Sequence, residues 1–256
     1  MFDRYAEKLS NVKTSMDLIK ILDSLSVSAG FSQYRLGLMM PTQHLGRPHL
    51  LIFSNCNPDW IENYSRSKLA SKDPILYLAM QQNSPIVWSS IGQYDDLPVG
   101  AQGVMDTAKE FGLMNGISFP LRGPRGEFGV LSLITDQVDS NVERHKAHLV
   151  MMANMVLDTA LRITYGKRAQ SPLTEREIEC LFWCGEGKTS SDTAVILGIA
   201  ETTVNFHLVK AVKKLGATNR SNAILIAGMA GLLQPQLNGA EIEDEISPNS
   251  QFNDQG

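Results

Sequence analysis

Residues 201–215 carry side chains whose types and spacing suit contact with a DNA double helix. On a helix, Asn205 can pair with an adenine edge, and Phe206 or Val209 can meet a thymine methyl group in the major groove. The surrounding hydroxyl and ammonium groups suit phosphate oxygens, and they belong to Lys188, Thr189, Thr202, Thr203, Lys210, Lys213 and Lys214. Alone, these lysines are equally consistent with an ordinary solvated face, so the elements that present them decide the interpretation.

Start and stop signals place this segment on the third of four short helices. Residues 174–177 have the capping-box pattern Thr-Glu-Arg-Glu, and residues 189–192 repeat the start signal. Gly198 ends the second helix after two turns, and residues 201–215 form the third. Ala200 stands at a capping position, which costs this helix about 1 kcal/mol relative to serine. A short helix, a tight turn and a longer helix predict a helix-turn-helix.

A second group of side chains lies in the first half of the chain. It combines aromatic rings with hydrogen-bond donors and acceptors that can function in a buried site. The indole of Trp60 is a donor that buries well, and the carboxylate of Asp73 is a strong acceptor. Each has a structural alternative. Trp60, Tyr64 and Trp88 can be core aromatics, and Asp73 before Pro74 can be a helix N-cap with proline at the first position.

The first 165 residues have the pattern of an α/β/α sandwich around an antiparallel sheet. Strands are predicted at residues 33–40, 49–55, 116–122 and 127–135, with a hairpin at 122–126. Helices are predicted at residues 14–29, 58–68, 74–83, 100–112 and 140–164. In the first of these, Met16, Ile19, Leu22 and Leu25 share one stripe. The predicted fold class is therefore α+β, with an all-α four-helix domain at the C-terminal end.

Bulk composition restricts the class of protein without selecting a function. The net charge of −4 is concentrated at the end of the chain, because residues 234–256 carry five acidic residues and no Lys or Arg. That tail is too polar to form an ordered structure by itself.

Cys56, Cys180 and Cys184 lack zinc-ligand spacing and are expected to be reduced core thiols. No apolar run is long enough to span a membrane and no signal sequence is evident, so we expect a cytoplasmic protein without metal or cofactor.

The last quarter of the chain closely resembles the LuxR-type C-terminal domain. The resemblance is carried by four segments: Leu173-Thr174-x-Arg176-Glu177, Gly187-Lys188-Thr189, Ile199-x-Glu201-x-Thr203-Val204-x-Phe206-His207, and Lys214 to Arg220. It implies a DNA-binding regulator, while the first half must decide what controls it.

The first 165 residues resemble the receptor domain for acyl-homoserine lactones. The motifs are Trp60-x-x-x-Tyr64, Asp73-Pro74, Trp88, Gly116 and the hairpin Gly123-x-x-Gly126-x-x-Gly129-x-Leu131-Ser132. The resemblance implies that Trp60 donates to the lactone carbonyl and Asp73 accepts from the ligand amide N–H. It further implies that Ser132 binds the amide carbonyl, Tyr64 lines the acyl chain and Trp88 packs near the lactone ring. The full set expected to bind the ligand is Trp60, Tyr64, Asp73, Trp88, Ser132, Cys56, Ile52, Leu76 and Leu113.

Such a ligand is neutral, with one amide donor, a few carbonyl acceptors and an alkyl tail that gains about 0.8 kcal/mol per buried methylene. Two residues depart from the receptor pattern. Cys56 stands where many such receptors have a tyrosine that helps to hold the amide carbonyl. Arg35 lies within an apolar strand, and two interpretations remain: an edge position with the guanidinium in solvent, or a polar group that meets an oxidised or aromatic acyl substituent.

Together these features predict a quorum-sensing transcription factor that binds an acyl-homoserine lactone and, as a homodimer, an inverted-repeat DNA site. The predicted parts are an autoinducer-binding domain (1–165), a linker (166–172), a helix-turn-helix domain (173–233) and an acidic disordered tail (234–256). RNA polymerase is a further expected partner, and activation versus repression stays open. Alternatives are an orphan receptor for a non-lactone signal, a phosphorylated response regulator, which would need a parallel receiver sheet, and a lactone-processing enzyme.

Overall fold

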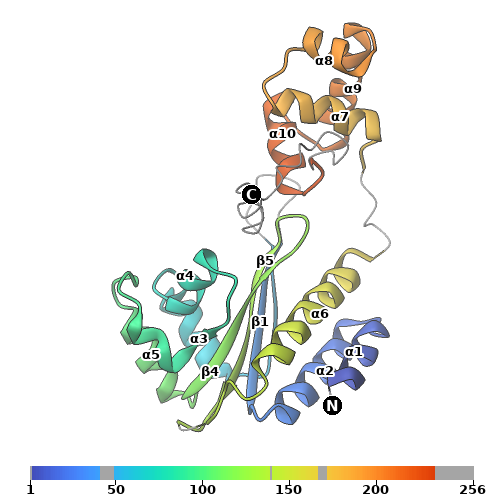
Figure 1. The fold of residues 1–256 in the computed structure, drawn as a ribbon. Helices are drawn as coiled ribbons and strands as arrows, with labels where there is room; N and C mark the ends of the chain where they lie inside the picture. The colour runs from blue at the N-terminus through green and yellow to red at the C-terminus, as the bar shows by residue number, and fades with distance from the viewer. Residues whose placement is uncertain (1, 41–48, 139, 167–171, 234–256) are drawn as a thin grey trace, which may run out of the picture.

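The computed structural model describes residues 2–40, 49–138, 140–166 and 172–233, and Figure 1 gives the arrangement of their helices and strands. The helices before residue 167 are α1 (Phe2–Ser10), α2 (Ser15–Ser28), α3 (Pro58–Arg66), α4 (Pro74–Gln81), α5 (Ala101–Glu110) and α6 (Lys146–Tyr165). The strands are β1 (Gln33–Met40), β2 (His49–Ser54), β3 (Ile86–Val87), β4 (Asn115–Arg122) and β5 (Phe128–Thr135). Two 3₁₀ turns, η1 (Leu69–Ser71) and η2 (Trp88–Gln93), complete this part.

The five strands form one antiparallel sheet in the order β2-β1-β5-β4-β3. Strands β4 and β5 form the predicted hairpin, and β1 pairs with both β5 and β2. Pro120 is tolerated within β4 because β3 pairs only with Ile117 and Ser118, so the outer edge of β4 is free of partner strands at the proline. The predicted α+β fold class is confirmed.

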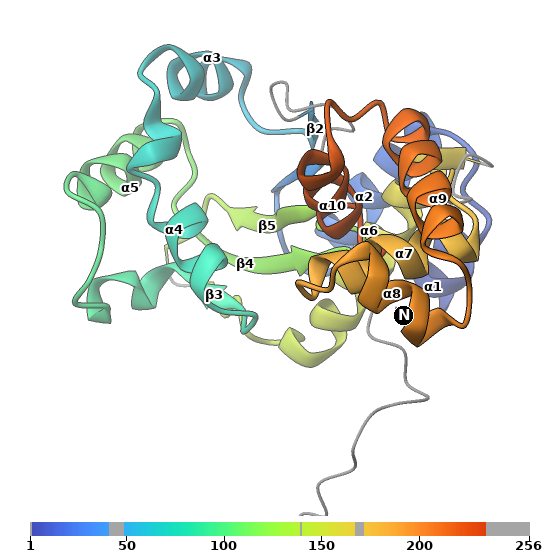
Figure 2. The same cartoon turned by 90° about the horizontal axis from the view of Figure 1, so that it is seen from above.

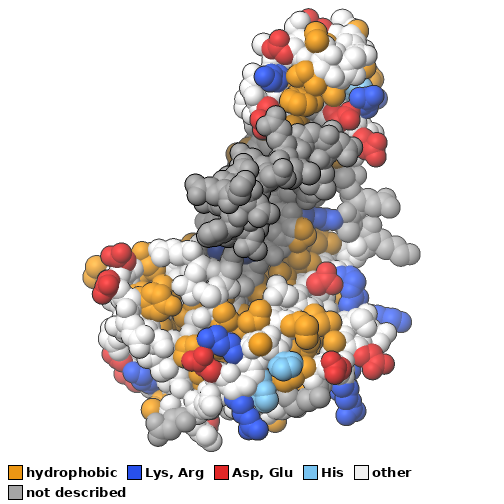
Figure 3. All heavy atoms as spheres, in the orientation of Figure 1, with side chains coloured by type: hydrophobic (Ala, Val, Ile, Leu, Met, Phe, Trp, Pro, Cys, Tyr) orange, Lys and Arg blue, Asp and Glu red, His pale blue; other side chains and the backbone are white. Residues whose placement is uncertain are grey.

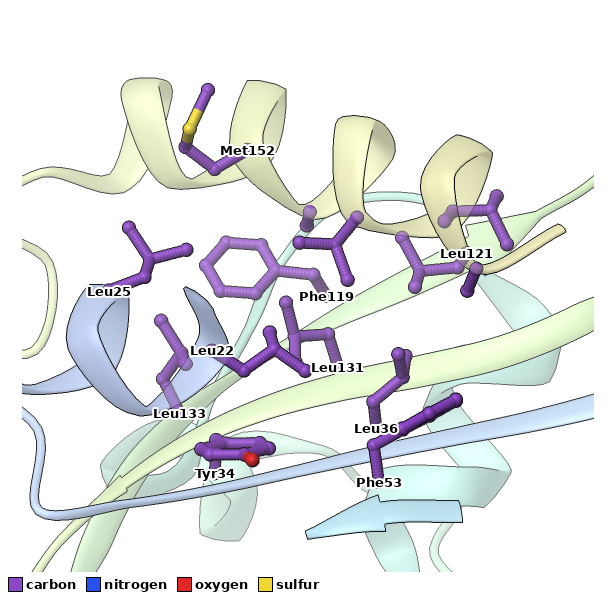
Figure 4. Packing of buried hydrophobic residues seen from close by; sticks show 14 of the residues in the cluster. Leu22, Leu25, Tyr34, Leu36, Phe53, Phe119, Leu121, Leu131, Leu133 and Met152 are labelled. Carbon is purple, nitrogen blue, oxygen red and sulfur yellow. The ribbon is translucent and has the colours of Figure 1, made fainter. Parts of the chain in front are cut away.

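One face of the sheet packs against α1, α2 and α6 and forms the main core. Tyr34, Leu36 and Leu131 of the strands belong to the same buried cluster as Leu22 of α2 and Met152 of α6, and Figure 4 shows these side chains between the sheet and the helices. These side chains alternate with residues that face the other way, as expected for strands buried on both faces. Figure 1 shows the same layer as the helices on the right-hand side of the sheet.

The opposite face is covered by α3, α4 and α5, which makes the predicted α/β/α sandwich (Figures 1 and 2). Two smaller clusters lie here. Trp60 and Leu113 pack with Ile134 of the sheet, and Ile75 packs with Val130. This face holds most of the residues that the sequence predicts to bind a ligand.

Four helices follow: α7 (Glu175–Gly185), α8 (Ser190–Leu197), α9 (Glu201–Lys214) and α10 (Arg220–Met229). Both predicted capping boxes are present, at Thr174 and Thr189, and Ala200 makes no side-chain cap. Helices α8 and α9 are bent by 107° relative to each other. The inward stripe of α9 packs against α7 and α10, with Val204, Leu208, Ala211 and Leu215 buried and Val212 half-buried.

In the first part of the chain, one prediction is wrong and three short elements were not predicted. Met16 is 61% exposed, because Leu18 rather than Met16 occupies the buried stripe of α2 with Leu22 and Leu25. Helix α1 was not predicted, although Phe2, Tyr5 and Leu9 have helical spacing and are buried. Strand β3 and the turn η2 were also missed, since two residues are too few for a periodic signal.

In the described part of the chain, no single helix is long and apolar enough to cross a membrane. Only the pair Ser190–Leu197 and Glu201–Lys214, taken together, reaches the length and apolar composition of a span, and these two helices are sharply bent relative to each other. Residues 167–171 of the predicted linker and the predicted acidic tail lie outside the described residues.

Candidate ligand-binding and DNA-binding sites

Asp73 occupies the N-terminal end of α4 and holds two donors. Its Oδ1 accepts from the backbone N–H of Ile75 at 2.8 Å, which caps the helix, and its Oδ2 accepts from the Tyr64 hydroxyl at 2.6 Å. Burial raises the pKa of Asp73 above its ordinary value despite these bonds. Burial, and then the charge of Asp73, raise the pKa of Tyr64, so this hydroxyl remains a donor. The N-cap interpretation is therefore correct, and one carboxylate oxygen faces Tyr64.

Trp60 lies at the centre of the aromatic cluster between α3 and α5. It is buried, with its ring 5.4 Å from the ring of Tyr64 and 5.8 Å from that of Phe111, measured between centroids. Among the described residues, no side-chain hydrogen bond engages its indole N–H. Trp60 is thus both the core aromatic of one interpretation and a donor that a ligand can use.

Trp88 starts a chain of hydrogen bonds that runs into the sheet. Its indole N–H donates to Ser118 Oγ at 2.8 Å, and Ser118 Oγ lies 2.8 Å from Ser132 Oγ. The Trp88 ring packs on Gly116, where a Cβ would lie 3.1 Å from the ring and 2.8 Å from the Leu133 carbonyl oxygen. When Ser118 donates to Ser132, the hydroxyl hydrogen of Ser132 is left to donate elsewhere.

Ser118 was not predicted from the sequence, and it belongs to a polar row across the sheet. Strand register places Ser118 opposite Ser132, Ser132 opposite Arg35, and Arg35 opposite Ser54. The β4–β5 hairpin pairs residues symmetrically about position 125, whereas the predicted turn at 122–126 is centred on position 124 and would place Ser118 opposite Val130, so the turn alone did not give this pairing.

Arg35 lies on a central strand, so the interpretation as an edge position with its guanidinium in solvent is wrong. Strand β1 is flanked by β2 and β5. The Arg35 guanidinium carbon lies 5.3 Å from the centroid of the Tyr64 ring, and its Nη1 atom is buried without a hydrogen-bond partner. Arg35 is consequently part of the wall that carries Ser132 and faces Tyr64.

The remaining predicted ligand residues occupy three environments. Cys56 is buried beside Trp60, and its thiol donates to the Tyr34 carbonyl oxygen at 3.4 Å. Leu113 is buried in the same cluster, whereas Leu76 is half-buried against the α4 cluster. Ile52 lies on edge strand β2 and is 43% exposed. Ile52 therefore lies at the margin of the site rather than within it.

The outer face of α9 presents the residues predicted to read bases. Phe206 is 54% exposed and Val209 is 69% exposed, and Lys210 Nζ lies 4.3 Å from the centroid of the Phe206 ring. Asn205 is exposed, and its Oδ1 accepts from the Ser190 hydroxyl of α8 at 2.8 Å. That bond occupies the amide oxygen and leaves the two amide N–H bonds available as donors.

The residues predicted to contact phosphates divide into exposed groups and structural ones. Lys188, Thr202, Lys210 and Lys213 are exposed, and Thr203 is half-buried. Thr189 donates to Asp192 Oδ2 at 2.6 Å and accepts from the Asp192 N–H, so its hydroxyl is engaged in the cap of α8. Figure 3 shows Lys and Arg intermixed with Asp and Glu on the visible surface, so neither charge dominates that face.

Lys214 has a partner within the domain, and this contact competes with its predicted role as a phosphate contact. Its ammonium donates to Glu177 Oε2 at 2.7 Å, and the Glu177 side chain is only 2% exposed. Burial alone would raise the pKa of Glu177, but the hydrogen bonds from Lys214 and Thr174 outweigh it and leave that pKa lowered. We therefore assign Lys214 to the packing of α9 on α7.

Comparison with known proteins agrees with this arrangement of two parts. The family described as "Autoinducer binding domain" matches residues 14–160, and that described as "Bacterial regulatory proteins, luxR family" matches residues 171–227. The chain is 38% identical to the transcriptional activator protein AhyR of Aeromonas hydrophila over 240 residues, which cover 91% of this chain and 92% of AhyR. It is 29% identical to the transcriptional activator protein LuxR of Aliivibrio fischeri, over 90% and 93% of the two chains.

A solved structure shares the fold along most of the chain. The crystal structure of Escherichia coli SdiA superposes with a TM-score of 0.73 at 24% identity, over 91% of this chain and 98% of that chain. The two family matches thus define a transcriptional regulator that joins a small-molecule receptor to a DNA-binding domain, rather than an enzyme. The chain belongs to the LuxR family of quorum-sensing transcriptional regulators, and its signal is an autoinducer.

Proposed function

We propose that the autoinducer of this regulator is an N-acyl-homoserine lactone bound between the sheet and helices α3 to α5. The observation that carries the proposal is the pairing of an acceptor on one wall with a donor on the other. Asp73 offers carboxylate oxygens from the helical side, and Ser132 offers a hydroxyl from the sheet. The N–H and the carbonyl of one amide point in opposite directions, so an amide between these walls uses both groups.

The rest of the site supports the same ligand. The free indole N–H of Trp60 suits the lactone carbonyl, and Trp88 provides a flat surface beside the Ser118–Ser132 pair for the ring. Tyr64 contributes its ring to the acyl chain while its hydroxyl holds Asp73 in place. Cys56, Leu76, Leu113 and, at the margin, Ile52 supply apolar surface around the chain.

We further propose that the chain acts as a cytoplasmic homodimer on an inverted repeat. Two copies of α9 would occupy successive major grooves, about one helical turn apart or a multiple of it. Helix α6 supports the pairing, because Met151 is 49% exposed and borders a groove that also involves Leu9, Asn154 and Arg162. The domain boundaries at 165, 173 and 233 and a contact with RNA polymerase belong to the same proposal.

Thermal unfolding tests the ligand proposal directly. A ligand that binds only the folded state stabilises it by about 2.7 kcal/mol at a concentration of 100 times its Kd. For a domain of this size that corresponds to a rise in Tm of roughly 5–10 °C. We expect such a rise with an acyl-homoserine lactone and none with the ring-opened acyl-homoserine, which adds a negative charge. Equal shifts with both compounds would contradict the assignment.

An orphan receptor for a non-lactone signal is the main alternative within the family. Small molecules extracted from the protein expressed in its own host can be identified by mass spectrometry. Recovery of an acyl-homoserine lactone supports the proposal, whereas recovery of a different compound that fills the same pocket overturns it.

A further inference from the structure

The guanidinium of Arg35 has a buried N–H donor that no acceptor in the site engages. Arg35 lies on central strand β1, directly opposite Ser132 of β5 and Ser54 of β2. Its Nη1 atom is buried and has no hydrogen-bond partner. An unsatisfied buried polar group destabilises the fold, and the cost is larger when the group is charged. A ligand acceptor at this position would recover that cost.

The charges around Arg35 define the kind of acceptor. The guanidinium stacks over the Tyr64 ring at 5.3 Å, and the Tyr64 hydroxyl donates to Asp73. The half-buried guanidinium of Arg35 and the carboxylate of Asp73 therefore both contact Tyr64, and their charges offset each other. A ligand with a full negative charge would upset that balance, whereas a neutral carbonyl or hydroxyl oxygen would accept from the guanidinium without adding charge.

Open space lies beside Arg35 on the same face of the strand. A Cβ built on Gly37, two residues along β1, would meet no atom within 4 Å. Strand register places Gly37 between Ile52 of β2 and Val130 of β5. An acyl chain that starts at Ser132 can thus pass the guanidinium of Arg35 and continue over Gly37 between apolar neighbours.

We propose that Arg35 selects a ligand whose acyl chain bears an acceptor oxygen close to the amide, as in a β-keto or β-hydroxy acyl group. This inference rests on the proposed function. Opposite residues of an antiparallel pair have Cβ atoms about 4.5–5.5 Å apart, so a group bound at Ser132 places the next few atoms of the chain within reach of Arg35.

The other acceptors of the ligand already have donors. Ser132 is poised to take the amide carbonyl, and Trp60 is assigned to the lactone carbonyl. The Cys56 thiol is committed to the Tyr34 carbonyl oxygen and does not compete for the acyl oxygen. An additional acceptor on the acyl chain is what remains for Arg35.

Paired lactones of equal chain length, with and without the β-keto group, test this inference. A hydrogen bond to a charged group contributes about 1.5–3 kcal/mol, so we expect wild type to bind the β-keto lactone at least about tenfold more tightly. Arg35→Leu should abolish that preference by weakening the β-keto ligand and leaving the unsubstituted one little changed. Melting of Arg35→Leu without ligand is the control for folding, because the variant removes both an unpaired donor and the cation that faces Tyr64 and Asp73.

Gln33→Leu is the matched control. Gln33 lies on the same strand face, and its Oε1 is also buried without a partner, so Arg35 could instead pair with Gln33 after a small rearrangement. The preference for the β-keto lactone should survive in Gln33→Leu. Equal affinities of wild type for the two lactones, or the same loss in both variants, would overturn the inference while the lactone assignment stands. Failure of both lactones to bind wild type would refute the proposed function itself.

Discussion

The Tyr64 hydroxyl donates to one oxygen of the Asp73 carboxylate, and the other oxygen caps helix α4 through the Ile75 N–H. A single side chain therefore joins the wall of the ligand site to the start of a helix. Substitutions of Asp73 that remove the cap disturb the fold and the site together, whereas a substitution that keeps the cap separates the two roles.

Asp73→Asn should weaken lactone binding while keeping the fold. Asparagine caps a helix about as well as aspartate, and its amide N–H groups would face the ligand N–H in place of an acceptor. We expect Kd to rise about 10- to 100-fold, the equivalent of a lost hydrogen bond to a charged group. Isothermal titration calorimetry measures the change, with far-UV circular dichroism as the control for folding. Unchanged affinity would exclude Asp73 as the acceptor.

The pH dependence of stability gives an independent test of Asp73. Its pKa is raised above the ordinary 3.8 in the folded chain, so the folded state binds this proton more readily than the unfolded state. The contribution of the group to stability is therefore lost as pH rises above about 3.8. Without ligand, Asp73→Asn should melt higher than wild type at pH 7, and the difference should shrink as pH falls toward 4. A difference that grows on acidification would contradict the raised pKa.

Ser118→Ala should destabilise the receptor domain although Ser118 is not expected to touch the ligand. It leaves the Trp88 indole N–H without its acceptor, which costs about 1–3 kcal/mol. Trp88→Phe in the same chain should recover part of this cost by removing the orphaned donor. A double-mutant cycle in urea unfolding measures the coupling, and strictly additive effects would argue against the Trp88–Ser118–Ser132 chain.

Lys210 and Lys214 should behave differently in DNA binding. Lys210→Ala should reduce the salt dependence of DNA affinity by about one unit of log–log slope, as expected for a lost phosphate contact. Lys214→Ala should leave the slope nearly unchanged and instead lower the melting temperature, because Glu177 would remain buried without its cation. Titrations over a range of salt concentrations compare the two variants. Equal loss of slope would restore Lys214 to the DNA contacts.

Local features of the structure could be predicted from the sequence. The capping boxes at Thr174 and Thr189 and the buried stripe of α9 are set by neighbours within one or two helical turns. The hairpin followed from its turn residues. Helix α1 has the same kind of signal in Phe2, Tyr5 and Leu9 and was overlooked.

The rest of the site depends on contacts that local patterns do not encode. The burial of Arg35 follows from the strand order, which brings β5 beside β1 although the two are far apart in the chain. The pairing of Lys214 with Glu177 spans 37 residues. Charged side chains in such positions look like solvated surface until tertiary packing places them.

The crystal structure of the protein bound to a β-keto acyl-homoserine lactone tests the central claim most directly. We predict the ligand amide nitrogen within hydrogen-bond distance of Asp73 and the amide carbonyl oxygen within that distance of Ser132, with the lactone carbonyl at the Trp60 indole. A ligand seated elsewhere, or an interior in which Trp60 and Asp73 turn away from a space already filled by protein side chains, would contradict it.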